Sequence, residues 1–373
     1  MVRLTAPPRR LSHTHRIRHS AAYASVAAVL GTFATAFGVG LGARHLQKIG
    51  LSVDSLLGLA LLGAGLALLG FAAVVTWRTL RRWWRLVLLP AWLLCVAVAM
   101  SLALSVMFTF VPRTELGSMT PADHGLAYTD VRFSTPDGVT LSAWMIPSSN
   151  HGAVILLHGA GSNRTSTLAQ AVVLARHGFG VLMVDARGQG RSGGRGMDIG
   201  WYGDQDVAGA LTFLQHRSDV YPTRIAILGL SMGGEEAIGA AAAHQGIRAV
   251  VAEGATQRTA EDKSGWLPSG FAGRIQRGLD QLTYGLTDVL TPARQPISLH
   301  AAIAKASGTP FLLIAAGRKS DETKAANYFR SAAPDRVWVW TAPGANHTGA
   351  LETNPLQWET QVITFLNRTL NTS

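Results

Sequence analysis

Cysteine is almost missing from this chain of 373 residues, which has only Cys95. That residue lies inside a long apolar run, so the polar part of the chain has neither disulfides nor thiol chemistry available to it. Charged residues are also scarce, at 15%, whereas 48% of the residues are hydrophobic. The hydrophobic fraction is high for a purely soluble protein.

Acidic residues are nearly absent from residues 1–112, which contain eleven Lys and Arg but a single acid, Asp54. The rest of the chain has 22 basic and 21 acidic residues, so the net charge of +11 comes almost entirely from the first part. These basic residues flank apolar runs, which is typical of membrane proteins rather than of a nucleic-acid-binding face. We therefore expect no nucleic-acid partner.

Three runs without a charged residue lie in this first part, at 21–42, 55–76 and 86–111. A helix needs about 20 such residues to cross the hydrocarbon of a bilayer, so the sequence predicts three transmembrane helices within residues 1–112. A basic segment precedes the first run, and a cleaved signal peptide is the alternative interpretation of that run. Its length and the two runs that follow favour a retained span.

The basic residues also predict an orientation in the cell membrane. Five Arg precede the first run and four lie between the second and third, against only Arg44 and Lys48 between the first and second. The side richer in basic residues is normally cytoplasmic. We expect a cytoplasmic N-terminus and an extracytoplasmic location for everything after the third span.

A polar linker, residues 113–124, precedes a region of alternating strand and helix patterns at 125–373. The first two strands flank the turn sequence Pro-Asp-Gly and predict a hairpin, while the later strands are short unbroken apolar runs. Such runs alternating with helices indicate a parallel sheet covered on both faces. The expected strands are 128–135, 139–146, 153–158, 180–185, 224–230, 249–254, 310–316 and 336–342.

The sequence Gly229-Leu230-Ser231-Met232-Gly233 follows one of these strands and opens a helix. This is the setting that the G-x-S-x-G pattern requires, because a sharp strand-to-helix turn leaves no room for a Cβ at either glycine. The turn would expose the hydroxyl of Ser231. We expect Ser231 to be a nucleophile.

Residues 125–370 resemble the α/β-hydrolase family, in particular serine hydrolases of the dienelactone-hydrolase and esterase-like branch. The segment "LLHGAGSNR" resembles the oxyanion loop of that family, and the resemblance implies that the backbone N–H groups of Ala160 and Met232 stabilise an oxyanion. It also implies a mostly parallel eight-stranded sheet with helices on both faces, and chemistry without a metal or an organic cofactor. "VDARGQGRSGG" resembles a structural segment of the family, which makes Asp185 and Arg187 scaffold residues.

A serine hydroxyl needs a base, and the resemblance places that base at His347, in "PGANHTGAL" after the last strand. The third member of the triad should follow the strand 310–316, where Asp321 is the expected acid. Asp321 is four residues beyond Gly317, whereas the acid of this family often stands three residues beyond that glycine. Glu322 and Glu253 therefore remain alternative acids.

An insertion at 255–308 has the apolar spacing of amphipathic helices, either a lid over the active site or helices packed at the sheet edge. The predicted function is that of a membrane-embedded serine hydrolase acting on a small-molecule or lipid acyl ester or thioester. A peptidase or amidase of the same fold, and a catalytically idle interaction protein, are the alternatives. The sequence does not indicate an oligomeric state.

Overall fold

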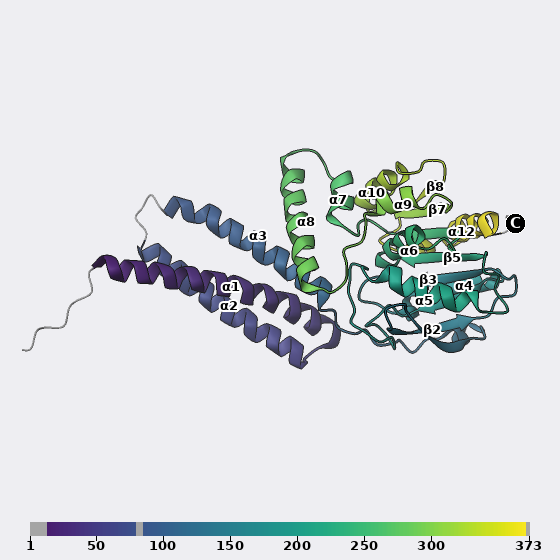
Figure 1. The fold of residues 1–373 in the computed structure, drawn as a ribbon, viewed down its shortest axis with the longest axis horizontal. Coiled ribbons are helices and arrows are strands. Elements are labelled where there is room, and N and C mark those ends of the chain that lie inside the picture. Colours follow the sequence, from purple (N-terminus) through teal and green to yellow (C-terminus); the bar gives the residue numbers. More distant parts are fainter. Residues whose placement is uncertain (1–12, 80–84, 371–373) are drawn as a thin grey trace, which may run out of the picture. The chain divides into compact units, whose positions relative to one another are not determined.

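The computed structural model describes residues 13–79 and 85–370 of the chain. The chain divides into two compact units, Met1–Met107 and Phe108–Ser373. The first consists of helices and the second combines a sheet with helices (Figure 1).

The first unit contains α1 (His13–Ile49), α2 (Val53–Thr79) and most of α3 (Arg85–Thr109). Within them, Ala22–Ile49, Val53–Thr79 and Pro90–Thr109 are long and apolar enough to cross a membrane. The expectation of three long apolar helices ahead of the hydrolase region is therefore confirmed. Residues 80–84 of the basic segment between α2 and α3, and residues 1–12, lie outside the described part of the chain.

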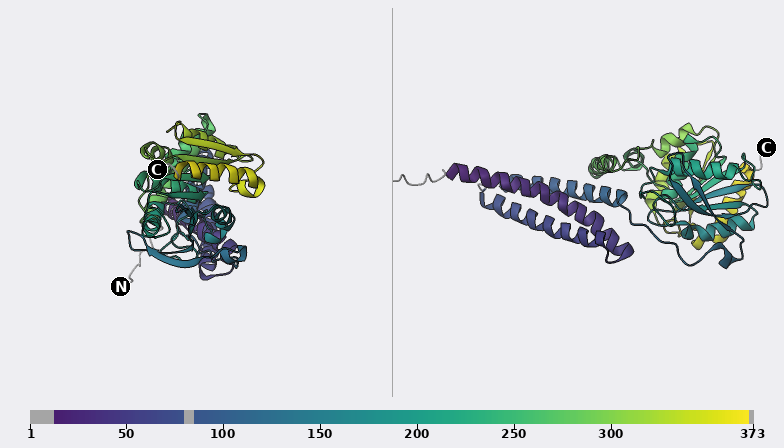
Figure 2. Two further views of the ribbon diagram at one scale, coloured as in Figure 1. Left: turned by 90° about the vertical axis from the view of Figure 1, so that its right-hand side faces the viewer. Right: turned by 60° about the horizontal axis from the view of Figure 1, so that its bottom comes forward.

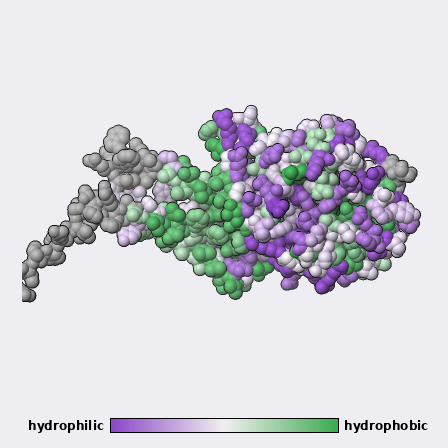
Figure 3. Space-filling view, viewed as in Figure 1, coloured by the Kyte–Doolittle hydropathy of each residue, from purple (hydrophilic) through white to green (hydrophobic). Residues whose placement is uncertain are grey.

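Small residues bring α1 and α2 close together. A Cβ added to Gly38 would lie 2.4 Å from the backbone N of Leu62, and one added to Gly58 would lie 2.3 Å from the N of Gly42. Close approach at small residues is how helices pack in lipid, where burial of leucine against another helix gives little advantage over contact with lipid. The surface of these helices is correspondingly hydrophobic (Figure 3). Exposed large apolar residues on α2 are Val53, Leu56, Leu57, Leu59, Leu66, Phe71, Val74 and Trp77.

The second unit is built on an eight-stranded sheet of order β1-β2-β4-β3-β5-β6-β7-β8. Antiparallel pairing joins β1 to β2 and β2 to β4, and the other neighbours are parallel. Every expected strand is present to within one residue at each end, which confirms the predicted sheet. The strands are β1 (Thr129–Ser134), β2 (Thr140–Ile146), β3 (Ala153–Leu157), β4 (Gly180–Val184), β5 (Ile225–Leu230), β6 (Ala249–Glu253), β7 (Phe311–Ala316) and β8 (Val337–Ala342).

Alternate residues of each strand enter different cores, as the twofold period of a strand requires. Ile155 of β3 packs in the core on one face and Leu156 in the core on the other. The first face is covered by α5 (Gly203–Gln215), α6 (Met232–Ala243), α9 (Leu299–Lys305) and α10 (Ser320–Arg330), and the second by α4 (Leu168–Arg176) and α12 (Pro355–Leu370). Short helices are Pro121–His124, Arg164–Thr167 and α11 (Ala350–Thr353).

The insertion at 255–308 forms α7 (Ala260–Trp266), α8 (Phe271–Leu290) and α9. Leu299, Ala302 and Ile303 of α9 are buried in the sheet core, so this part of the insertion is a packing helix. By contrast, α8 lies at the margin of the sheet domain in both Figure 1 and Figure 2, where Tyr284 packs against Trp201. The insertion therefore has two parts with different surroundings.

Candidate active site

Ser231 stands at the sharp turn between β5 and α6, at the carboxyl end of a central strand. Its backbone has φ 54° and ψ −119°, a conformation that residues with a side chain rarely adopt. The turn is held by a hydrogen bond from Ser231 N to the carbonyl of Glu253, at 2.7 Å, and by Glu235 N, which donates to the carbonyl of Ser231 at 3.1 Å. A strained backbone conformation of this kind persists only where several surrounding contacts hold it in place.

Two glycines make room for this turn, and a third lies beside it. A Cβ on Gly229 would lie 2.0 Å from the carbonyl oxygen of Gly233, and one on Gly233 would lie 2.5 Å from that of Leu157. A Cβ on Gly159 would lie 3.4 Å from the Cβ of Ser231, which places the loop after β3 directly beside the serine. The predicted glycine requirement of the G-x-S-x-G turn thus has a steric cause visible in the structure.

His347 lies in the loop after β8 and connects Ser231 to a carboxylate. Its Nε2 is 2.9 Å from Ser231 Oγ, and its Nδ1 is 2.7 Å from Glu322 Oε1. An ionised carboxylate can only accept, so Nδ1 carries the proton and Nε2 accepts from the serine hydroxyl. Gly254 leaves space for the ring, because a Cβ there would lie 2.9 Å from His347 Cε1.

The acid beside His347 is Glu322, and the expectation that Asp321 would occupy this position is corrected. Asp321 points to solvent, with 64% of its side chain exposed, and pairs with Lys324 at 3.0 Å. Glu322 is buried, and its second oxygen accepts a hydrogen bond from the backbone N of Ala316 at 2.8 Å. The carboxylate is thereby fixed to the end of β7 as well as to the histidine.

The helical period explains why the two neighbours differ. Helix α10 begins at Ser320, so successive side chains in its first turn point about 100° apart. Glu322 shares its face with the buried Ala325, Ala326 and Phe329, three, four and seven residues further on. This apolar spacing is visible in the sequence, and it could have distinguished Glu322 from Asp321.

Glu253, the other alternative acid, is buried at the end of β6 but is directed elsewhere. Its carboxylate accepts hydrogen bonds from Ala350 N at 2.9 Å and from the indole of Trp358 at 3.0 Å. Burial raises the pKa of this carboxyl above its ordinary value, against the opposing effect of these hydrogen bonds. Glu253 thus anchors the segment after His347 to the sheet.

Ala160 and Met232, the expected oxyanion donors, lie on the two sides of the serine. Met232 is the first residue of α6, and the first N–H groups of a helix have no partner within it. Ala160 is exposed and follows Gly159, the glycine beside the serine. The next residue, Gly161, is held by Asp198, which accepts its N–H at 2.9 Å.

The electrostatic surroundings of His347 favour its charged form. The hydrogen bond to Glu322 raises the pKa of His347 above its ordinary value, although partial burial opposes this effect. A second carboxyl, Glu235, was not singled out from the sequence. Burial raises its pKa to about 7, and it accepts hydrogen bonds from Thr256 N at 3.2 Å and Gln257 N at 3.0 Å. Glu235 therefore ties α6, one turn after the serine, to the start of the insertion.

The segment after β4 has the scaffold role expected for it. Asp185 is fully buried and accepts the N–H groups of Arg164 and Arg191, both at 2.9 Å. Arg187 pairs with Asp137 at 2.7 Å and with Asp206. These ion pairs hold loops of the sheet domain together.

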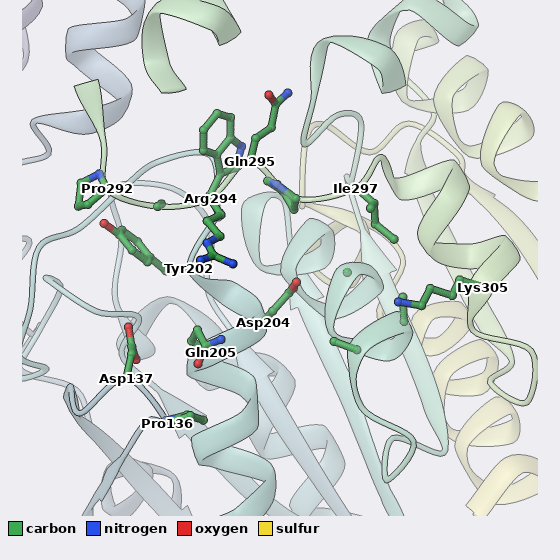
Figure 4. A pocket seen from close by; sticks show the side chains of 16 residues that line it. Pro136, Asp137, Tyr202, Asp204, Gln205, Pro292, Arg294, Gln295, Ile297 and Lys305 are labelled. Atoms are coloured by element: carbon green, nitrogen blue, oxygen red, sulfur yellow. The ribbon is translucent and has the colours of Figure 1, made fainter. Parts of the chain in front are cut away.

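A cavity of about 540 Å³ lies elsewhere in the sheet domain, between α5, α6 and the segment 292–297 (Figure 4). Asp137, Tyr202, Asp204 and Lys305 are among its lining residues. Asp137 and Asp204 are already paired with arginines, and neither Ser231 nor His347 lines the cavity. The reactive groups are therefore those at the carboxyl ends of β5, β7 and β8.

Several known proteins are similar to parts of this chain. A family model described as serine aminopeptidase, S33, matches residues 148–299. The chain is 35% identical to the uncharacterized protein YfhR of Escherichia coli O157:H7 over 129 residues. This stretch covers 32% of this chain and 45% of that protein. Over 133 residues the chain is 36% identical to the uncharacterized protein Rv2307c of Mycobacterium tuberculosis, 35% of this chain and 45% of that protein. The matched stretches thus span less than half the length of these relatives.

A solved structure gives the wider match. The esterase Pf2001 of Pyrococcus furiosus aligns with a TM-score of 0.55 and 25% identity over 70% of this chain and 99% of that one. The hypothetical protein PA2218 of Pseudomonas aeruginosa shares the fold, with a TM-score of 0.52 and 20% identity over 69% of this chain and 99% of that one. The chain has the α/β-hydrolase fold, with three long apolar helices ahead of its hydrolase domain.

Proposed function

We propose that the protein is a membrane-anchored serine hydrolase that cleaves a carboxylic ester or thioester through an acyl-enzyme. The hydrogen-bonded series Ser231–His347–Glu322 carries this proposal, because it joins a nucleophile, a base and an orienting carboxylate in the order that acyl transfer requires. The side-chain hydroxyl of a serine in this setting is activated without a metal or an organic cofactor.

The steps follow from the geometry of these groups. Ser231 Oγ attacks the acyl carbonyl carbon while its proton passes to His347 Nε2, and Glu322 stabilises the resulting imidazolium. The N–H groups of Ala160 and Met232 bind the oxyanion that forms. His347 then returns the proton to the leaving alcohol or thiol as its bond to the acyl carbon breaks. Water, deprotonated by His347, attacks the acyl-enzyme and releases the acid and Ser231.

The test is reaction of the full chain with a fluorophosphonate probe, followed by an activity panel of p-nitrophenyl esters of increasing chain length. We expect the wild type, and not Ser231→Ala, to be labelled. Absence of labelling in the wild type would favour a catalytically idle scaffold. The description of the matching family model favours a peptidase or amidase as a second candidate, and hydrolysis of aminoacyl p-nitroanilides in preference to esters would establish it.

The same proposal places the three apolar helices in the cell membrane, with the N-terminus in the cytoplasm and the hydrolase domain outside. The excess of basic residues before α1 and between α2 and α3 supports this orientation. The small-residue contacts between α1 and α2, with leucines on the outside, support a lipid environment.

A further inference from the structure

Helix α8 packs on the sheet domain through its polar and small side chains. Lys263 of α7 donates to Asp280 Oδ1 at 2.9 Å, and Tyr284 lies with its ring stacked on that of Trp201, 6.4 Å between centroids. The packed face is therefore held by a hydrogen bond and an aromatic contact rather than by aliphatic side chains. Its buried residues are Gly273, Asp280, Thr283, Tyr284 and Thr287.

The aliphatic side chains of α8 face away from that packed side. Their spacing of three or four residues places them on one stripe of the helix, and none of them is buried. Phe271 is 71% exposed, Ile275 49% and Val289 83%. A soluble domain normally turns such a stripe toward its core, so this arrangement indicates a partner outside the domain. The apolar stripe consists of Phe271, Ile275, Leu279, Leu282, Leu286 and Val289.

The three N-terminal helices of the same chain have a similar arrangement, with small residues inside and large apolar residues outside. In their case the exposed leucines suit lipid. Helix α8 of the second unit is arranged in the same way, with small and polar residues on its packed side and the apolar stripe exposed. A bilayer is thus the apolar medium that this chain already requires.

The first residues of the second unit, Phe108 and Thr109, contact other parts of that unit. They are also the last residues of the third span, and both carbonyls accept hydrogen bonds from the sheet domain: Asp198 N at 2.9 Å and Arg195 Nε at 3.0 Å. Phe108 also packs against a small apolar cluster that contains Tyr284 of α8. The residues that leave the span therefore belong to the same cluster as α8, with no spacer between them.

One basic side chain borders the apolar stripe. Arg274 is exposed and lies 6.0 Å from the ring centroid of Phe271, whereas Arg277 donates to the carbonyls of Leu267 and Pro268. Amphipathic helices that lie in a bilayer surface combine an apolar stripe of this kind with Arg or Lys on the polar side, where they meet lipid phosphates.

We propose that the apolar stripe of α8 lies in the lipid–water interface of the bilayer that the chain spans. The inference rests on the membrane anchoring proposed above. The helix would lie along the membrane surface, with its stripe among the acyl chains and its polar, buried face on the hydrolase domain. The domain is then attached to the membrane at two places, the end of the third span and α8.

Depth-dependent fluorescence quenching tests this proposal on the full chain. Single-cysteine variants Ile275→Cys and Val289→Cys are made in a Cys95→Ser background, labelled with NBD, and reconstituted into phosphatidylcholine vesicles that contain doxyl-labelled lipid. Gln281→Cys is the matched control, because it is exposed on the same helix but lies outside the apolar stripe, on the flank that carries Arg274. Leu94→Cys, 64% exposed on α3, reports on the span itself.

Labels on the stripe should be quenched by lipid with a doxyl group near the headgroup at least about twofold more than the label at Gln281. The Leu94 label should respond most to a doxyl group deep in the acyl chain. Equal quenching on the stripe and at Gln281, with Leu94 quenched, would overturn the proposal and leave the membrane anchoring intact. Stripe labels that resist quenching, together with cross-linking of the unlabelled cysteine variants between molecules by a bismaleimide, would replace lipid by a second copy of the chain. No quenching at Leu94 would instead overturn the membrane anchoring.

Discussion

Replacement of Glu322 by glutamine should remove most of the activity although it barely changes the shape of the side chain. One carboxylate oxygen accepts from the backbone N of Ala316 and the other faces Nδ1 of His347. A glutamine whose oxygen remains on Ala316 turns its amide N–H₂ toward Nδ1. The histidine is then held with its proton on Nε2, the wrong tautomer to accept the proton of Ser231.

Two losses determine how far the activity of Glu322→Gln falls: the negative charge beside His347 and the correct tautomer of its ring. The charged hydrogen bond that stabilises the imidazolium in the transition state is worth up to about 3 kcal/mol, roughly a factor of 100. The wrong tautomer adds to this loss, and an amide in place of a triad carboxylate can cost about 10⁴-fold in kcat. We expect kcat/KM of Glu322→Gln to fall between about 10² and 10⁴-fold.

The pH profile provides a second readout of the same contact. The catalytic base must be neutral, and Glu322 raises the pKa of His347 above the ordinary histidine value. In the wild type, kcat/KM should therefore fall as the pH drops through a value above about 6.5. In Glu322→Gln the cause of the shift is gone, so the acidic limb should move to lower pH. The ion pair of His347 with Glu322 makes its full contribution to the free energy of unfolding when the pH is below the ordinary histidine pKa. This contribution is lost as the pH rises through the raised pKa of His347.

Asp321→Asn is the matched control, because it makes the same chemical change one residue away, at an exposed carboxylate that pairs with Lys324. Exposed pairs contribute little, so its kcat/KM should stay within about twofold of the wild type. The assay is p-nitrophenyl ester hydrolysis by the full chain in detergent from pH 5 to 9. A Glu322→Gln enzyme that keeps more than about a tenth of the activity, or a larger loss in Asp321→Asn, would refute the assignment of the acid.

Ser231→Gly and Ser231→Ala should both abolish hydrolysis, but the glycine variant should resist thermal unfolding better, by about 1 kcal/mol, because it relieves the strained backbone; equal transition temperatures would contradict this. Gly229→Ala should prevent folding or labelling by a fluorophosphonate, since its Cβ has no space. Glu253→Gln should lower stability by about 1–3 kcal/mol through one unsatisfied buried donor and leave kcat within severalfold; a loss comparable to Glu322→Gln would give it a catalytic role. A reporter active only outside the cytoplasm should be active after Ser373 and inactive after Arg85.

The strands were predictable because each is an unbroken apolar run bounded by polar or turn residues. Burial on both faces requires such runs, as in Ile225–Leu230, where every residue is buried. The serine was predictable for a related reason: it follows β5 directly, so the strand end fixes its place, and the histidine was predictable from the motif in the loop after β8. Residues separated from a strand by a turn and the start of a helix have positions that the strand end constrains less.

The acid is such a residue, since β7 and Glu322 are separated by a turn and the start of a helix. Counting from Gly317 favours Asp321, but the direction of a side chain in α10 depends on where the helix begins. Glutamate also has one more methylene than aspartate, so it reaches the histidine from a position further along the chain. Spacing alone could not choose between the two carboxylates, whereas the apolar face of α10 could have.

The direction of α8 was beyond sequence reasoning for a different reason. An amphipathic pattern shows that a helix has an apolar face, not that this face meets the core of its own domain. In α8 the residues that pack on the domain are glycine, aspartate, threonine and tyrosine. Only the contacts of Asp280 and Tyr284 reveal which side is buried.

The segment that leaves the third helix is part of the hydrolase domain rather than a free linker. Thr114 Oγ1 donates to the carbonyl of Gly161 at 2.9 Å, and Asp198, which accepts the N–H of Gly161, donates its own N–H to the carbonyl of Phe108. Gly161 follows Ala160, so the same hydrogen bonds that fix the end of the span also fix the loop expected to bind the oxyanion. A chain that begins at residue 113 would lack Phe108 and loosen Asp198 in that loop. Hydrolysis by such a fragment would therefore understate that of the full chain, which is the form in which the active site should be measured.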